Sequence, residues 1–331
     1  MPRISLIIPV FNRPEEVDEL LDSLSRQRDP GFEVVIVEDG STEKCEEVIK
    51  RFEDTLEISY YYKENSGPGP SRNYGSEMAK GDFMVFVDSD CLIPPHYIAT
   101  VREGLDREKV DAFGGPDRAH ESFSILQKSI SFSMTSFLTT GGIRGGGEKL
   151  GKFHPRSFNM GFSREVFRTT GGFAPMRFGE DVDLSIRILE QGFKTGLFRD
   201  AWVYHKRRTN VRQFFKQVFN SGIARINLYK RHPSSLRAVH FAPAFFTLGS
   251  FALILLGSIL SPWFFLPLLL HMILIFFTST LQNRCIRIGF LSILTSYIQL
   301  LAYGSGFLIA FWKRLVLGRE EYAAFTRNFY K

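Results

Sequence analysis

The sequence is poor in cysteine, and the cysteines it has follow no ligand or disulfide pattern. Among 331 residues only Cys45, Cys91 and Cys285 occur, and they are widely spaced and outside any CxxC pair. Structural zinc sites and disulfide frameworks need several cysteines at short, regular spacing. The sequence therefore predicts neither, and this composition is typical of a protein in a reducing compartment.

The loop after the first apolar run lacks glycine. Ile4–Val10 reads as a strand, and Phe11-Asn12-Arg13 follows it without a GxGxxG pattern. Dinucleotide-binding domains need those glycines because their backbone must approach the pyrophosphate closely. This excludes a nicotinamide-dependent oxidoreductase. The run is also too short, and too soon followed by polar residues, for a signal peptide, so we expect the soluble part to stay in the cytoplasm.

Charged residues are nearly absent from three long segments in the last third of the chain. These segments are Phe241–Leu260, Trp263–Leu281 and Gly289–Trp312. Each reaches or approaches the roughly 20 apolar residues that cross a bilayer core. A helical hairpin buried in a soluble domain would normally keep a polar face, and these segments have almost none. The composition therefore predicts membrane helices after residue 240.

Basic residues exceed acidic ones, giving a formal net charge of +6, and they concentrate beside the apolar segments. One cluster precedes the first segment, Arg284 and Arg287 separate the second from the third, and Lys313 and Arg314 follow the last. Cytoplasmic loops carry this bias, and basic residues are attracted to anionic lipid headgroups. We therefore expect a multi-pass protein of the cell (inner) membrane that binds membrane lipids and no nucleic acid. Three full crossings would put the tail outside, so one segment is a candidate for a re-entrant or interfacial helix.

The first 205 residues alternate short apolar runs with helical patterns. Ile4–Val10, Glu33–Val37 and Phe83–Val87 read as buried strands, because they lack the polar alternation of a half-exposed strand. Strands that alternate with helices indicate an α/β fold with a doubly wound, mostly parallel sheet. Ligands bind beyond the carboxyl ends of such strands.

Acidic residues occupy those strand ends. Glu38-Asp39-Gly40 follows the second run, and Asp88-Ser89-Asp90 follows the last. Two carboxylates one residue apart can approach one divalent cation, Mn or Mg, that also binds a substrate diphosphate. Further along, Asp181 and Asp183 lie near the start of a predicted helix, whose dipole favours ionised carboxylates that can act as a base. The pattern predicts a nucleotide-diphosphate substrate.

Two other segments carry functional hypotheses. The Gly-rich segment 141–147 is interpreted either as a lid beside the site or as a surface connector. The segment Val211–Arg231 spaces apolar residues along one helical face, with arginine and lysine on the other. This pattern is typical of a helix that lies in the membrane interface.

Six short motifs follow one another in the first 205 residues. They are Pro9-Val10-Phe11-Asn12-Arg13, Glu38-Asp39-Gly40-Ser41, Arg72-Asn73, Asp88-Ser89-Asp90, Asn159-Met160-Gly161-Phe162 and Gly179-Glu180-Asp181-Val182-Asp183-Leu184. In this order and spacing they resemble the family 2 glycosyltransferases of the GT-A fold. The resemblance covers roughly residues 3–205 and implies a Rossmann-like catalytic domain followed by C-terminal membrane helices.

The resemblance also implies which residues bind the nucleotide of the donor. Pro9 and Val10 would line the nucleotide pocket, and Asp39 would accept a hydrogen bond from the base, typically uracil. Arg72 would help to bind the same nucleotide, and Asp88 would approach the ribose.

The remaining implied roles concern the metal and the chemistry. Asp90 would ligate the divalent cation, and His205 looks like the histidine that some relatives place near the diphosphate or the metal. Asp181 matches the catalytic base of the family, which takes the proton of the acceptor hydroxyl during transfer with inversion.

The expected function is transfer of a single sugar from a nucleotide-diphosphate sugar, typically a UDP-sugar, to a lipid-linked (polyprenyl) acceptor. The sequence lacks the Gln-x-x-Arg-Trp motif of processive polysaccharide synthases, which disfavours long-chain synthesis. Two alternatives remain: transfer directly to polyprenyl phosphate, and a non-catalytic membrane scaffold with a degenerate transferase domain. The predicted divisions are 1–205 for the catalytic domain, 206–240 for the interface helix and linker, 241–312 for the membrane helices and 313–331 for a basic tail.

Overall fold

The computed structural model describes residues 2–140 and 153–325, and these fall into two units. The first unit contains residues 2–120 and 153–206, and the second contains residues 121–140 and 207–325. The end of the first unit lies one residue beyond the predicted boundary at 205. The grouping of 121–140 with the C-terminal helices has no counterpart in the prediction. The Gly-rich segment 141–147 lies outside the described residues.

A seven-stranded mixed sheet forms the centre of the first unit, in the order β3-β2-β1-β4-β8-β6-β9. Its first four strands are parallel, β8 runs antiparallel to both of its neighbours, and β6 pairs parallel with β9. The strands are β1 (Ile4–Val10), β2 (Phe32–Asp39), β3 (Glu57–Lys63), β4 (Phe83–Val87), β6 (Ala112–Gly114), β8 (Asn159–Ser163) and β9 (Thr195–Leu197). This confirms the predicted mostly parallel α/β sheet.

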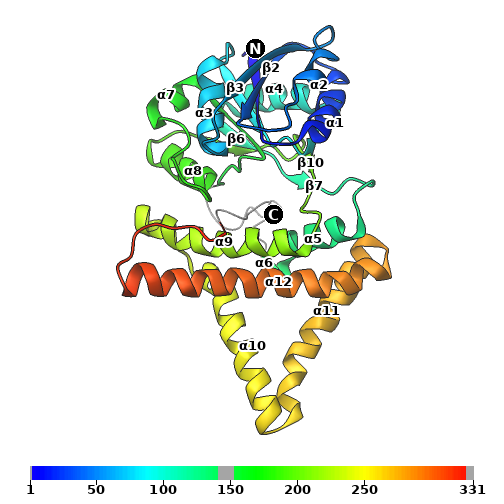
Figure 1. Ribbon diagram of the computed structural model, residues 1–331, viewed down its shortest axis with the longest axis vertical. Helices are drawn as coiled ribbons and strands as arrows, with labels where there is room; N and C mark the ends of the chain where they lie inside the picture. The colour runs from blue at the N-terminus through cyan, green and yellow to red at the C-terminus, as the bar shows by residue number, and fades with distance from the viewer. Residues whose placement is uncertain (1, 141–152, 326–331) are drawn as a thin grey trace. The chain divides into compact units, whose positions relative to one another are not determined.

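Helices cover both faces of this sheet, which is why its central strands are apolar throughout (Figure 1). Alternate residues of β1 face two separate cores: Ile4, Leu6 and Ile8 belong to one, and Ile7 to the other. The helices of this unit are α1 (Pro14–Ser25), α2 (Glu46–Lys50), α3 (Pro68–Met78), α4 (Tyr97–Glu108), α7 (Arg164–Thr170) and α8 (Glu180–Glu190).

Helix α3 approaches the sheet closely at Gly75. A Cβ atom at this position would lie 2.6 Å from Cγ2 of Ile7 and 3.1 Å from Cγ2 of Val37. A larger residue would therefore push the helix away from β1 and β2. Since α3 begins at Pro68, directly after the loop that follows β3, this contact fixes the start of α3 beside the carboxyl ends of the parallel strands.

A small three-stranded sheet, β5-β10-β7, lies in the same unit. Its strands are β5 (Cys91–Leu92), β7 (Asp117–Arg118) and β10 (Val203–His205). In the antiparallel pairing of β10 with β5, His205 lies opposite Cys91. Residues more than a hundred positions apart are thereby brought next to the acidic motif that ends at Asp90.

Local hydrogen bonds set the bounds of two elements. Helix α2 is confined to Glu46–Lys50, because the backbone N–H groups of Thr42 and Glu43 donate to Oδ1 of Asn12. Strand β8 begins only at Asn159, after a turn that Arg156 closes. In both places a side-chain or turn hydrogen bond replaces regular structure.

The second unit is helical. It consists of α5 (Ile125–Thr135), α6 (Phe137–Thr140), α9 (Val211–Arg231), the short helices η2 (Pro233–Ser235) and η3 (Ala238–Phe241), α10 (Ala242–Ile259), η4 (Pro262–Phe265), α11 (Leu266–Asn283), α12 (Ile286–Phe311) and the π-helical turn η5 (Trp312–Val316). The predicted amphipathic helix agrees with the bounds of α9, and the three apolar segments correspond to α10, α11 and α12.

Small residues let the helices of this unit approach closely. Gly222 of α9 lies against the carbonyl of Tyr303, and Gly306 of α12 lies against the carbonyl of Phe219. Helix α5 contacts α12 as well, since Oγ1 of Thr295 donates to the carbonyl of Ser129 at 3.1 Å. Such glycine and hydroxyl contacts are typical of helix packing in membranes. Much of the apolar face of α9 is therefore covered by α12.

Within residues 2–140 and 153–325, three helical stretches are long and apolar enough to cross a membrane, namely Ala238–Ile259, Pro262–Asn283 and Ile286–Val316. Helices α10 and α11 converge on η4, whereas α12 runs alongside α9 (Figure 1). The three differ in burial: 44% of the most apolar stretch of α12 is buried, against 17% and 11% for the other two. Large apolar side chains of α10 and α11, such as Phe251, Ile259, Leu269 and Phe277, are exposed.

Candidate active site

The carboxylate of Asp39 organises the loop between β3 and α3. It accepts hydrogen bonds from the backbone N–H groups of Ser66 (2.9 Å) and Gly67 (2.8 Å), and it pairs with Nζ of Lys63 at 2.6 Å. Its side chain is only 6% exposed. Asp39 therefore has a structural task that the sequence did not indicate, besides its predicted contact with a base.

The end of β1 supplies the predicted nucleotide-pocket residues and a sharp turn. Pro9 and Val10 lie opposite Val37 and Glu38 in the parallel pairing with β2, so they share one sheet edge with Asp39. Asn12 follows in the left-handed region, with φ of 52°, which asparagine tolerates better than most residues. This turn precedes Arg13.

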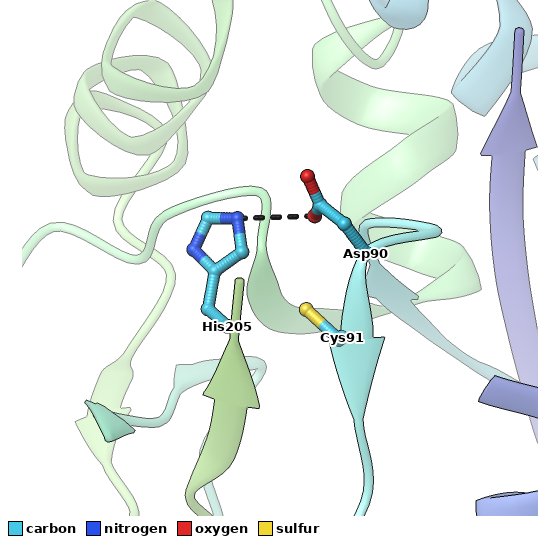
Figure 2. Close-up of side chains that lie close together, drawn as sticks. All are labelled: Asp90, Cys91 and His205. Carbon is cyan, nitrogen blue, oxygen red and sulfur yellow. Dashed lines mark ion pairs between the residues drawn. The ribbon is translucent and has the colours of Figure 1, made fainter. Parts of the chain in front are cut away.

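The end of β4 gathers the groups that fit a divalent cation. Oδ1 of Asp90 lies 3.2 Å from Nε2 of His205, and the ligand atoms of Asp90, Cys91 and His205 all lie within 4.8 Å of one another. Figure 2 shows the imidazole directed toward the Asp90 carboxylate, with the Cys91 thiol beside both. The Phe158 ring stacks on that imidazole, with 5.2 Å between the ring centroids and an angle of 19° between the ring planes. The structure thus brings together the two predicted metal ligands.

Cys91 lies beside these ligands with a buried thiol. Burial, followed by the nearby carboxylates of Asp90 and Asp88, raises the pKa of the Cys91 thiol well above its ordinary value. Carboxylate and imidazole ligands suit Mn²⁺, and a neutral thiol adds little to it. The donor set therefore fits a divalent cation held by one oxygen and one nitrogen of the protein.

Arg72 links the acidic motif at residues 88–90 to the one at residues 179–184. Its guanidinium is 3% exposed and pairs with Oδ1 of Asp88 at 2.7 Å and with Oε1 of Glu180 at 3.2 Å. The side chain also lies over the Phe173 ring, 5.3 Å from its centroid. Arg72 therefore holds Asp88 and the start of α8 in one network, and its predicted contact with a nucleotide remains a prediction.

Asp181 is held by groups that keep it ionised. Nε of Arg156 lies 2.6 Å from its Oδ2, and the backbone N–H of Val182 donates to its Oδ1 at 2.8 Å. Burial alone would raise the pKa of Asp181, but the charge and hydrogen bond of Arg156 and the charge of Arg72 together lower it. In contrast, burial and the neighbouring Asp181 carboxylate raise the pKa of Glu180. Of the two adjacent acids, Asp181 is the one whose surroundings favour the ionised carboxylate.

Asp183 has a different task. Its carboxylate pairs with Arg187 at 2.8 Å, and the same guanidinium donates to the carbonyls of Thr170 and Gly172. Asp183 thus ties α8 to the end of α7.

Three basic residues without a predicted role each pair with a predicted site carboxylate, namely Arg13, Lys63 and Arg156. Arg13 stands inside a quoted motif, so its position was a usable signal. Lys63 ends a strand whose register with β2 places it opposite Asp39. Arg156 precedes β8 in an irregular segment, where no periodicity points to its partner.

Comparison with known proteins identifies this arrangement. The model of the family described as glycosyl transferase family 2 matches residues 5–171, half of the chain. Validoxylamine A glucosyltransferase of Streptomyces hygroscopicus subsp. jinggangensis (strain 5008) is 35% identical over 105 residues, which are 30% of this chain and 25% of that protein. The poly(ribitol-phosphate) beta-N-acetylglucosaminyltransferase TarS of Staphylococcus aureus (strain Mu50 / ATCC 700699) is 33% identical over 115 residues, 34% of this chain and 20% of that protein. The chain thus spans a quarter or less of these two relatives.

The fold resembles that of solved glycosyltransferases. The mannosyltransferase PcManGT from Pyrobaculum calidifontis, solved in complex with GDP-Man and Mn²⁺, superposes with a TM-score of 0.68 at 18% identity over 95% of this chain and 88% of that one. At this identity the likeness concerns the fold, and it confirms the GT-A architecture. With a family model that matches half of its length and a fold that agrees, the chain belongs to glycosyl transferase family 2.

Proposed function

We propose that this chain transfers a single sugar, with inversion, from a nucleotide-diphosphate sugar, UDP-linked in the first instance, to a lipid-linked acceptor at the cytoplasmic face of a membrane. The observation that carries the proposal is the ion-pair network in which Arg72 joins Asp88 to Glu180. It connects the acidic motif suited to a cation with the motif that holds an ionised base. A non-catalytic scaffold would not need charged residues in both motifs, so their presence favours an enzyme.

The proposed chemistry needs a base on the acceptor side and a cation on the leaving-group side. Asp181 takes the proton of the acceptor hydroxyl as the new bond forms, because that hydroxyl is far too weak an acid to ionise alone. A cation held by Asp90 and His205 would supply charge stabilisation to the departing diphosphate. Asp39, Pro9 and Val10 position the nucleotide. Direct transfer through an oxocarbenium-like transition state then requires no covalent glycosyl-enzyme intermediate.

A donor screen tests this function. The full chain in detergent micelles with Mn²⁺ is given UDP- and GDP-linked sugars, with a polyprenyl-diphosphate saccharide or polyprenyl phosphate as the acceptor. We expect one donor to extend the diphosphate-linked saccharide by a single sugar of inverted configuration. A product carrying one sugar on a monophosphate lipid supports the direct transfer to polyprenyl phosphate instead. Nucleotide binding with neither transfer nor donor hydrolysis would indicate a scaffold.

Removal of the Arg156 charge should change the pH dependence of the reaction. With Arg156→Gln, the pKa of Asp181 rises, because the guanidinium that opposes the effect of burial is lost. The base is then protonated at higher pH, so the acidic limb of the pH profile of kcat/KM should move upward. The matched control is Arg168→Gln, an exposed arginine of α7 in the same unit. An acidic limb unchanged in Arg156→Gln would contradict Asp181 as the titrating base.

We further propose that α10 and α11 form the membrane hairpin and that α12 lies along the interface with α9. The basic residues before α10, at Arg284 and Arg287, and at Lys313 and Arg314 can then all face the cytoplasm. The larger buried share of α12 supports this arrangement, since α9 and α5 cover it. The hairpin would hold the catalytic unit where lipid-linked acceptors are concentrated.

The native cysteines allow a direct test of this topology. Cys45 and Cys91 are 0% and 1% exposed, so a membrane-impermeant maleimide should label wild type at the partly exposed Cys285 between α11 and α12. In a Cys285→Ser background, Glu320→Cys reports the end of α12 and Ser261→Cys reports the turn between α10 and α11. We expect labelling at 285 and 320 from the cytoplasmic face only. Labelling of position 320 from the opposite face would show that α12 crosses.

A further inference from the structure

Arg13 lies where the cation and the diphosphate of the proposed reaction would meet. It follows the turn at Asn12, which is anchored by the hydrogen bonds from Thr42 and Glu43, and it precedes Pro14, the first residue of α1. Since β1 and β4 are parallel neighbours, their carboxyl ends bring Arg13 and Asp90 to one edge of the sheet. Nη1 of Arg13 lies 2.7 Å from Oδ2 of Asp90.

Arg13 pairs with the Asp90 carboxylate, the same group to which the proposed function assigns the cation. Arg13 holds Oδ2 of Asp90, and His205 lies 3.2 Å from Oδ1. The side chains of Arg13 and Asp90 are 23% and 13% exposed, so solvent screens their interaction only in part. A divalent cation on the same carboxylate would face a guanidinium at close range, and like charges so near in a partly buried site repel strongly. The cation can therefore bind well only if Arg13 moves away.

An anion must then take over the guanidinium. A second carboxylate near Arg13 is that of Glu16, whose Oε1 lies 3.8 Å from Nη1 of Arg13, with a side chain 33% exposed. A diphosphate offers a better partner, because the planar guanidinium donates two parallel hydrogen bonds to phosphate oxygens. The diphosphate also brings the negative charge that is needed when the divalent cation and the Arg13 guanidinium occupy the same site.

We propose that Arg13 is a counter-ion for Asp90 that is exchanged for the cation when the nucleoside diphosphate arrives, after which Arg13 binds the diphosphate itself. This inference rests on the proposed function, because that function places a cation on Asp90. Its consequence is thermodynamic: the cation and the nucleotide bind cooperatively, each strengthening the other by the same factor. The cation binds weakly to the protein without nucleotide.

The test measures Mn²⁺ binding without any turnover. Free Mn²⁺ is followed by electron paramagnetic resonance during titration of the full chain in detergent, with UDP, with GDP and without nucleotide. For wild type we expect one nucleotide to tighten Mn²⁺ binding by about 5–150-fold, the usual range of coupling between two sites. In Arg13→Gln, Mn²⁺ should bind more tightly than to wild type when nucleotide is absent, and nucleotide should tighten Mn²⁺ binding by a smaller factor than in wild type.

Two further variants separate charge from structure. Arg13→Lys keeps the positive charge but not the paired donors, so Mn²⁺ affinity without nucleotide should stay near that of wild type while nucleotide affinity falls. Arg26→Gln removes an exposed arginine just after α1, paired with Asp22, and should behave as wild type throughout.

The outcomes distinguish this inference from the proposed function. Wild-type coupling together with an unchanged Arg13→Gln titration overturns the role of Arg13 and leaves the metal-dependent function standing. Nucleotide-independent Mn²⁺ binding in wild type overturns the exchange in the same way. Absence of Mn²⁺ binding with either nucleotide overturns both, because Asp90 would then hold no cation.

Discussion

Replacement of Asp181 by asparagine should lower turnover by about 10²–10⁴-fold, the usual contribution of a general base, while nucleotide affinity changes little. Asparagine keeps the size of the side chain and can still accept a hydrogen bond from Arg156, but it cannot take the acceptor proton. Glu180 is a poor substitute because its carboxylate is engaged by Arg72. Calorimetry with the nucleoside diphosphate and Mn²⁺, beside a turnover assay, measures both quantities.

Asp39→Asn is the matched comparison for that experiment. Its predicted contact is with the base of the nucleotide, and its carboxylate also holds Lys63 and the Ser66–Gly67 backbone. Nucleotide affinity should therefore fall in this variant, because both the contact and the shape of the loop exist before the chemical step. Near-normal turnover in Asp181→Asn would mean that the base is another group.

Replacement of Asp90 by alanine should lower turnover by about 10³-fold or more, because a bound cation contributes several kcal/mol of charge stabilisation in the transition state. EDTA should have the same effect on wild type, and Mn²⁺ should restore activity better than Mg²⁺, since one of the two ligands is an imidazole. In His205→Ala, the activities restored by Mn²⁺ and by Mg²⁺ should differ less than in wild type. Full wild-type activity in EDTA would contradict the assignment of a cation to Asp90.

The fold of the catalytic unit was predictable because its central strands carry their signal locally. Ile4–Val10 and Phe83–Val87 are continuous apolar runs, and the structure gives both strands the same bounds. The parallel order of β1, β2 and β4 then places Asp39 and Asp90 at one edge, which is why acidic residues after strands could be interpreted from the sequence alone.

The partners of the site residues were not predictable in the same way. Cys91 and His205 meet through a strand pairing across more than a hundred residues, and Arg156 reaches Asp181 from a turn. Side chains in irregular segments follow no periodicity, so the distances between them could not be predicted even where their residue types suggested a function. Nothing in the sequence of α5 indicated that this helix contacts α12.

The contacts of α5 bear on how the catalytic unit can be prepared for study. Ile130 and Met134 of α5 are buried in a cluster with Phe214 and Val218 of α9 and Ala302 of α12. A soluble version made by stopping the chain near residue 205 would keep α5 and remove every one of those neighbours. Without these neighbours, α5 would expose its apolar residues to solvent. Such a fragment should aggregate even though its sheet is complete. A soluble catalytic fragment therefore needs polar replacements on α5 as well as a new end.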